Sequence, residues 1–155
     1  MVRRTEVFER ARNYAFLLLK FRLRSENELA QRLRLKKISE ETIQEVISFL
    51  KEKKFIDDHV FAKAWLDSRL KRPLGLRRIK QELGQKGVDK KIIEQEAAKL
   101  KDYSESQTVL GLAKERLNRL KGVEPDCAKR RLYAFLLRRG FSPEIVTDVL
   151  NQLCR

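Results

Sequence analysis

One seven-residue motif occurs three times in this chain and limits what the chain can fold into. The copies span Leu33–Ser39, Leu83–Asp89 and Leu136–Ser142, and they begin 50 and 53 residues apart. In order, each copy has a leucine, two further residues, a basic residue, a position filled by glycine or lysine, an apolar residue, and a residue suited to start a helix. Self-similarity at such a spacing is typical of repeat proteins, in which neighbouring units pack end to end.

The pattern within each repeat predicts helices. Apolar residues recur at intervals of three and four, and strand-type alternation is absent. Ser25 and Glu28 have the spacing of a capping box, in which each side chain bonds the backbone of the other residue. Helix starts are expected near Thr5, Ser25, Ser39, Asp57 or Asp58, Gly75, Asp89, Ser104, Asp126 and Ser142. The first helix should reach about Leu23 and the fourth about Arg72, and a loop is expected over Gly122–Pro125.

Nine helices in three sets of three give an all-α fold. We expect three tandem three-helix repeats of the helix-turn-helix type, with boundaries at residues 1–55, 56–102 and 103–155. Gly87 and Gly140 can adopt the left-handed conformation that ends a helix at low cost. Lys37 occupies the same place in the first repeat, so its turn should be strained or built differently.

The charge balance points to an anionic partner. Lys and Arg number 36 against 22 Asp and Glu, for a net charge of +14. Such an excess favours a polyanion, although a basic but otherwise ordinary helical protein is the alternative. Hydrophobic residues make up 42% of the chain, which is enough for a packed core. Cys127 and Cys154 are too few to form a disulfide framework or a zinc site, so we expect a reducing, cytoplasmic compartment. We also expect no membrane-spanning segment.

The basic residues are concentrated on the second helix of each repeat and the loop before it. The third helices carry many acids, which phosphates would repel. The middle repeat is the densest, because residues 69–80 contain no acid. The predicted contact residues of this basic segment are Arg69, Lys71, Arg72, Arg77, Arg78 and Lys80. Arg22, Arg24 and Lys36 of the first repeat are predicted to extend the contact, which would follow a backbone without reading its sequence.

Several conspicuous residues have simpler explanations than catalysis. Asp57 and Asp58 precede a helix, where acids act as caps. Trp65 lies on an apolar helical stripe and is expected to pack in the core. His59 has no nucleophile motif beside it and is expected to be exposed. We therefore expect a protein that is not an enzyme and that uses no metal or cofactor.

The middle of the chain resembles the RecX family. The matching residues are Phe55-Ile56-Asp57-Asp58, Phe61-Ala62, Ser68-Arg69, Gly75, Arg78-Ile79, Leu83 and Lys86-Gly87-Val88. The first repeat matches at Tyr14-Ala15, Leu18-Leu19, Arg22, Arg24-Ser25, Glu28-Leu29 and Leu33. The last third resembles the family through the repeat pattern and the Arg-Arg-Gly-Phe turn.

This resemblance implies a curved, elongated body and a cytoplasmic modulator of the RecA recombinase. Family members bind the RecA filament on single-stranded DNA and generally inhibit its ATP hydrolysis, strand exchange and coprotease activity. The resemblance thus implies RecA and single-stranded DNA as partners in DNA repair and recombination, and we expect a monomer. Which basic residues would touch DNA and which would touch protein stays open.

The alternative function is that of a sequence-specific helix-turn-helix transcription factor. Such a protein would present a basic last helix with base-reading side chains, usually in a symmetric dimer. The acidic third helices argue against this function.

Overall fold

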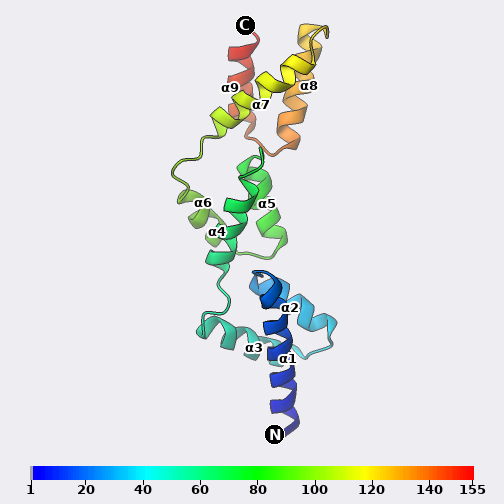
Figure 1. Cartoon of the computed structure of the whole chain (residues 1–155), viewed down its shortest axis with the longest axis vertical. Helices are drawn as coiled ribbons and strands as arrows, with labels where there is room; N and C mark the ends of the chain where they lie inside the picture. The colour runs from blue at the N-terminus through cyan, green and yellow to red at the C-terminus, as the bar shows by residue number, and fades with distance from the viewer. Residues whose placement is uncertain (1) are drawn as a thin grey trace. The chain divides into compact units, whose positions relative to one another are not determined.

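The computed structural model describes residues 2–155, and these form nine α-helices and no strand (Figure 1). The helices are α1 (Val2–Phe21), α2 (Glu26–Leu35), α3 (Glu40–Glu52), α4 (Asp58–Arg69), α5 (Leu76–Gln85), α6 (Lys90–Ala98), α7 (Glu105–Arg119), α8 (Pro125–Arg138) and α9 (Pro143–Leu153). The predicted all-α fold of three successive three-helix repeats is confirmed.

Most of the predicted helix starts are found where the caps placed them. The Ser25 hydroxyl accepts from the Glu28 amide at 3.1 Å, and the Ser25 amide donates to the Glu28 carboxylate at 3.3 Å, which completes the capping box. Ser39 and Ser104 accept in the same way at the starts of α3 and α7.

The predicted bounds of three helices are wrong. The first helix begins by Val2 rather than near Thr5 and ends at Phe21 rather than about Leu23. Asp126 does not begin α8, because Glu124 accepts from the amides of Asp126 and Cys127 and Pro125 fills the first helical position. Proline is suited to that position because its missing N–H would have no partner there. The fourth helix ends at Arg69 rather than Arg72, where the chain turns toward Pro73.

The turn between second and third helices is built alike in all three repeats. Lys37, Gly87 and Gly140 have φ angles of 59°, 78° and 87°. The following apolar residue donates its amide to the leucine that opens each motif: Ile38 to Leu33 at 3.2 Å, Val88 to Leu83 at 3.1 Å, and Phe141 to Leu136 at 3.3 Å. These are the helix-ending bonds of a Schellman turn. Of the two expectations for Lys37, strain is therefore the correct one, because a side chain is held in the left-handed region.

The helices pack into two compact units that do not coincide with the repeats. The first holds the described residues up to Ala64 together with Leu83–Ala97, and the second holds Trp65–Glu82 and Ala98–Arg155. The middle repeat is thus shared, its turn and α6 packing with the first repeat and most of α5 with the third. The repeat boundaries at residues 55 and 102 stay predictions.

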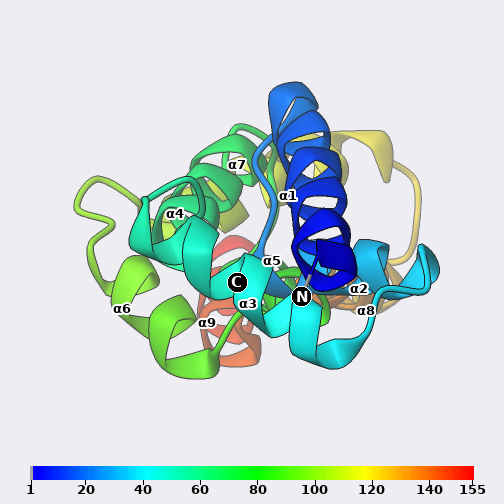
Figure 2. The same cartoon turned by 90° about the horizontal axis from the view of Figure 1, so that it is seen from below.

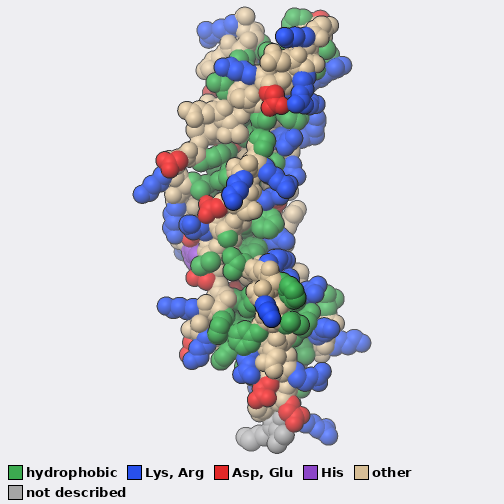
Figure 3. All heavy atoms as spheres, in the orientation of Figure 1, with side chains coloured by type: hydrophobic (Ala, Val, Ile, Leu, Met, Phe, Trp, Pro, Cys, Tyr) green, Lys and Arg blue, Asp and Glu red, His purple; other side chains and the backbone are tan. Residues whose placement is uncertain are grey.

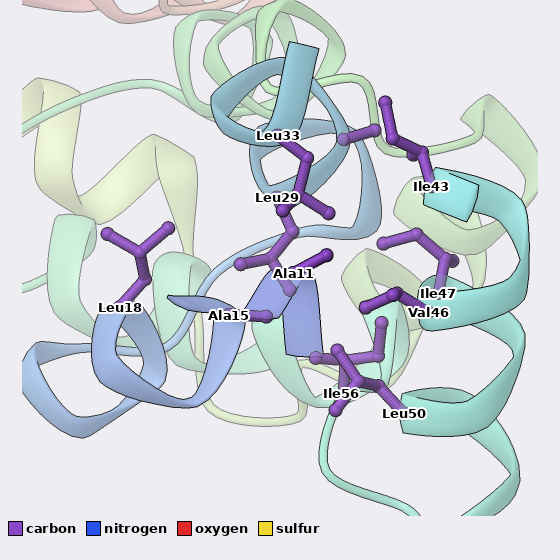
Figure 4. Close-up of a cluster of buried hydrophobic side chains, with 11 residues drawn as sticks. Ala11, Ala15, Leu18, Leu29, Leu33, Ile43, Val46, Ile47, Leu50 and Ile56 are labelled. Atoms are coloured by element: carbon purple, nitrogen blue, oxygen red, sulfur yellow. The ribbon is translucent and has the colours of Figure 1, made fainter. Parts of the chain in front are cut away.

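The first unit is centred on a cluster of buried apolar side chains from α1, α2 and α3, helices that lie side by side in both views (Figures 1 and 2). The cluster consists of Ala11, Ala15, Leu18, Leu29, Ala30, Leu33, Ile43, Val46, Ile47, Leu50 and Ile56 (Figure 4). Two alanines on α1 allow the neighbouring helices to approach closely. The second unit has a corresponding cluster of Val109, Ala113, Leu132, Leu136, Phe141, Val146, Val149 and Leu150.

Each unit joins one repeat to the next through the same turn. In the first unit the Ser25 hydroxyl donates to the Lys86 carbonyl at 2.6 Å, next to Gly87. In the second unit the amide of Gly75 donates to the Arg139 carbonyl at 2.9 Å, next to Gly140. Ser25 and Gly75 are equivalent positions, since each precedes the second helix of its repeat. The turn of one repeat therefore packs on the start of the second helix of the preceding repeat.

An acid strengthens each of these connections; Asp58 is buried and Glu105 is half-buried. Asp58, at the start of α4, accepts from the first amide of α2, Glu26, at 3.0 Å. The carboxylate of Glu105, at the start of α7, interacts with the backbone of Leu76, the first residue of α5, and of Ser142, while its Oε1 atom is buried without a hydrogen-bond partner. Burial raises the pKa of both carboxyls even though these amides favour the ionised form. In the first two repeats, the start of the second helix thus interacts with an acid of the following repeat, whereas α8 is capped by its own Glu124.

Replacing Lys37 with glycine should stabilise the first unit. A side chain in the left-handed region costs roughly 1 kcal/mol, and the extra freedom of glycine in the unfolded chain offsets part of that gain. We expect a net gain of about 0.5 kcal/mol in the free energy of unfolding, measured by urea denaturation with circular dichroism. Lys36→Gly is the matched control, because it removes the same charge at a φ of −83°. Equal effects of the two substitutions would contradict the strain.

Candidate nucleic-acid interface

The basic segment, residues 69–80, covers the end of α4, the following loop and the first part of α5, all in the second unit. Leu74 and Gly75 are buried and anchor the loop, while Lys71, Arg72, Arg77 and Arg78 are exposed. The anchored loop therefore holds four cations at the surface on a short, fixed stretch of backbone.

Gly75 brings a second group of cations to this segment. A Cβ atom on Gly75 would lie 2.1 Å from the Gly140 carbonyl oxygen, and one on Gly140 would lie 2.3 Å from the Cβ of Arg78. Only glycine allows these backbones to approach so closely. The turn that contains Arg138 and Arg139 consequently lies against the start of α5.

We call the combined surface the basic junction and define it as Lys71, Arg72, Arg77, Arg78, Arg138 and Arg139. The last two were not among the predicted site residues. In the sequence, Arg138 and Arg139 stand out only as part of the repeated turn before Gly140. The sequence does not show what that turn packs against.

Arg69 has a structural contact that its charge alone did not reveal. Its guanidinium donates twice to the Glu82 carboxylate, at 2.8 and 2.6 Å, and lies 5.7 Å from the centre of the Trp65 ring. The indole of Trp65 donates to the same carboxylate at 3.0 Å, and Arg78 approaches it at 3.6 Å. Glu82 therefore ties α4 to α5 and partly neutralises this end of the segment.

The pKa of Glu82 reflects these contacts. Burial raises it, but the hydrogen bonds from Arg69 and Trp65 and the charges of Arg69 and Arg78 together lower it below the usual glutamate value. Lys80 and Arg77 face the other acid of this region, since their charges favour the ionised form of Glu105. Of the basic junction, Arg78 thus lies near Glu82, and the charge of Arg77 acts on Glu105.

The remaining predicted residues lie in the first unit, where acids compensate the charge. Arg22 is paired with Glu28 at 2.6 Å, and Lys86 lies 3.6 Å from the same carboxylate. Arg24 is half-buried, and burial followed by the charge of Arg22 lowers the pKa of its guanidinium. Lys36 is exposed and lies 5.2 Å from the centre of the Tyr14 ring.

The contact between the first and second repeats therefore differs in charge from the contact between the second and third repeats, at equivalent positions. Glu28 precedes the aligned Leu29, and Arg78 precedes the aligned Ile79. An acid at this position neutralises the first junction, whereas a base at this position adds to the second. Within the second repeat junction, Glu82 and Glu105 leave several cations without a fixed acid at the surface.

Asp57 and Asp58 both have structural roles, as predicted, but they bond the starts of two different helices. Asp57 accepts from the His59 amide at 2.8 Å and caps α4, whereas Asp58 bonds α2. The ring of His59 is partly exposed, and its Nδ1 atom lies 2.9 Å from a carboxylate oxygen of the buried Glu96. Sequence reasoning missed this pair, because 37 residues separate its members. Trp65 is half-buried rather than fully enclosed.

On the face shown in Figure 3, Lys and Arg side chains are spread from the N-terminal to the C-terminal helices and far outnumber acids.

None of the helices in the described part of the chain is long and apolar enough to cross a bilayer. Within residues 2–155, no three His, Cys, Asp or Glu side chains are placed to hold a metal ion together.

The fold and the site together define a class: proteins of tandem three-helix repeats with a basic surface where two repeats meet. Residues 11–50, 57–95 and 104–150 match the first, second and third three-helix domains of RecX. The chain belongs to the RecX family of regulatory proteins.

Individual relatives agree with this assignment. The chain is 34% identical over 145 residues to regulatory protein RecX of Clostridium botulinum strain Eklund 17B, covering 92% of this chain and 68% of the relative. It is 33% identical over 151 residues to the protein of the same name from Amycolatopsis mediterranei, covering 97% and 86%. The crystal structure of RecX from Lactobacillus salivarius is similar with a TM-score of 0.88 at 25% identity, covering 96% of this chain and 97% of that one.

Substituting Gly75 with alanine should weaken the second unit. The added methyl group would collide with the Gly140 carbonyl, and overpacking of this kind costs roughly 1–3 kcal/mol. Gly84→Ala is the matched control: no atom lies within 4 Å of its added Cβ, and alanine in a helix gains up to about 1 kcal/mol over glycine. Urea denaturation followed by Trp65 fluorescence measures both. Stabilisation by Gly75→Ala would disprove the close packing.

The fluorescence of Trp65, the only tryptophan, should report the protonation of Glu82. Because the folded-state pKa of Glu82 is lowered, its proton binds only below the ordinary glutamate value of about 4.3. The contacts of Arg69 and Trp65 with the carboxylate thus stabilise the fold above that range, and this contribution is lost on acidification. An emission change centred below about pH 4.3 is expected while circular dichroism still shows folded protein. Glu82→Gln should remove it, and an unchanged transition in this variant would exclude Glu82 as its origin.

Proposed function

We propose that this protein binds the RecA filament on single-stranded DNA and inhibits its ATP hydrolysis, strand exchange and coprotease activity, thereby regulating DNA repair and recombination. The single observation that carries the proposal is the basic junction, where six cations lie on and beside a loop anchored by the buried Leu74 and Gly75. The family membership supports a regulatory role, and the charge defines the kind of partner.

The form of the junction favours contact with a phosphate backbone. Its cations come from a loop, a helix start and a turn, so they do not line one helix that could enter a groove and read base edges. Backbone contacts of this kind depend on charge and on salt, and they require no particular sequence. A nucleoprotein filament presents such a backbone continuously.

The third helices are poorly suited to the alternative of a transcription factor. Glu40 is paired with Arg34 at 2.5 Å, and Glu41 is paired with Arg4 at 2.8 Å, on the helix that would read bases in the first repeat. In the last repeat α9 contains no Lys or Arg at all. Acids on these helices would be repelled by phosphates.

In this proposal the protein acts by binding rather than by catalysis, as a cytoplasmic monomer without a cofactor. Arg72, Arg77 and Arg78 make the main contact, together with Lys71. Arg69 and Lys80 hold the segment in place, and Arg22, Arg24 and Lys36 of the first unit extend the contact along the filament.

Reversing Arg72, Arg77 and Arg78 to glutamate should abolish inhibition of the DNA-dependent ATPase activity of RecA. The substitutions turn three attractive charges into repulsive ones. The slope of log affinity against log salt for single-stranded DNA should become shallower by roughly 2, because each phosphate that a cation neutralises contributes about 0.7 to it. A steady-state ATPase assay and fluorescence anisotropy at several salt concentrations measure the two effects.

The matched control reverses the exposed Lys90, Lys91 and Lys101, which changes the net charge by the same amount outside the junction. This control should inhibit nearly as well as the wild type. A milder variant with glutamine at positions 72, 77 and 78 guards against misfolding, and circular dichroism checks each protein. Full inhibition by the folded glutamate variant would refute the proposed site.

A further inference from the structure

An open groove of about 690 Å³ lies between α8 and α9 in the last repeat, apart from the basic junction. It is lined by Asp126, Lys129, Arg130, Tyr133, Thr147, Leu150 and Asn151. Lys129 donates to the Asn151 side-chain oxygen at 3.0 Å and so links the two walls. Volumes of this size accommodate small organic groups such as a nucleotide.

The repeat alignment shows what covers the equivalent helix face elsewhere. Leu29, Ile79 and Leu132 are aligned and fully buried, so Arg130 corresponds to Asn27 and Arg77 in the earlier repeats. In those repeats the aligned residues begin the helix and are covered: a Cβ on Gly87 would touch Asn27, Asp58 accepts from the Glu26 amide, and Glu105 interacts with the Leu76 backbone. In the last repeat α8 begins four residues earlier, at Pro125. No segment among residues 2–155 covers α8 in this way, which leaves the groove open for a ligand.

The side chains of the groove suit one nucleotide of a single strand. Tyr133 is an exposed aromatic residue beside two cations, and Leu150 forms an apolar floor. Aromatic rings next to basic groups are the usual platform for single-stranded nucleic acids, because every base can stack on a ring while its phosphate meets a cation. Thr147 and Asn151 add polar groups that can bond the edge of a base.

We propose that this groove binds one base of single-stranded DNA, stacked on Tyr133, with the adjoining phosphate held by Lys129 and Arg130. The proposal rests on the function proposed above only in its choice of single-stranded DNA as the ligand. It adds a base-dependent contact to a protein whose basic junction binds phosphates alone.

A second copy of this chain is a poorer occupant. In the earlier repeats the covering element is the turn of the following repeat. The corresponding turn at the start of a second copy carries Lys36 and Lys37, which would face Lys129 and Arg130 with like charge. Lys37 also has a side chain where both covering turns have glycine, and the Cβ of such a residue would collide as Gly87 shows.

The test compares binding of an oligothymidylate with binding of an abasic oligonucleotide of the same length, by fluorescence anisotropy at one salt concentration. The wild type should bind the thymidylate roughly 5-fold or more tightly, as expected for one stacked base. Tyr133→Ala should remove that preference and leave abasic binding unchanged, while Tyr133→Phe should keep it. Arg130→Ala should weaken binding of both oligonucleotides.

The outcomes separate this inference from the proposed function. Equal binding of both oligonucleotides by the wild type, with ATPase inhibition intact, would overturn the stacking site and leave the basic junction standing. The Arg72, Arg77 and Arg78 charge reversal should weaken both oligonucleotides equally and keep the preference for bases. If Tyr133→Ala instead changes only filament binding, or only self-association measured by sedimentation, the occupant is a protein and the inference is wrong.

Discussion

The fold depends on the bond between a carboxylate and the first amide of a helix in the preceding repeat. Asp58 bonds the start of α2, and Glu105 bonds the start of α5. A helix N-terminus has unpaired amides and a partial positive charge, so an ionised acid satisfies both at once. Beside each bond, a glycine turn fits against the same helix start. In the first two repeats the start of the second helix therefore packs against the following repeat, which explains why the compact units cut through the middle repeat.

This dependence accounts for how much of the fold could be predicted. Caps and apolar periodicity are local, so the nine helices, the buried residues of α1 and the three turns could be inferred from neighbouring residues. The partners of Asp58, Glu82 and Glu96 could not, because each is bonded to residues far away in the sequence. Either Asp57 or Asp58 was expected to cap the fourth helix; Asp57 does so, whereas Asp58 bonds the start of α2. For Lys37 the two aligned glycines predicted either a strained turn or a different one, and the structure shows the same turn with Lys37 in the left-handed region.

The candidate site was predicted less completely for the same reason. Charge density identified the basic segment, but density does not distinguish an exposed cation from one that is bonded to an acid. Arg69 is held by Glu82, whereas Arg72 and Arg77 are exposed at the surface. Arg138 and Arg139 join the junction only through the contact between Gly75 and Gly140. The contact that joins the second and third repeats thereby also brings the cations of the basic junction together, where Arg78 stands at the position of Glu28 in the first repeat.

The central claim is that a polyanionic filament binds where the second and third repeats meet. Amide hydrogen exchange of the protein, alone and with RecA on single-stranded DNA, tests it most directly. We expect new protection concentrated in residues 69–80 and in the turn at 136–141, with α3 and α6 unchanged. Protection confined to the third helices, α3, α6 and α9, with the basic junction still exchanging freely, would contradict it.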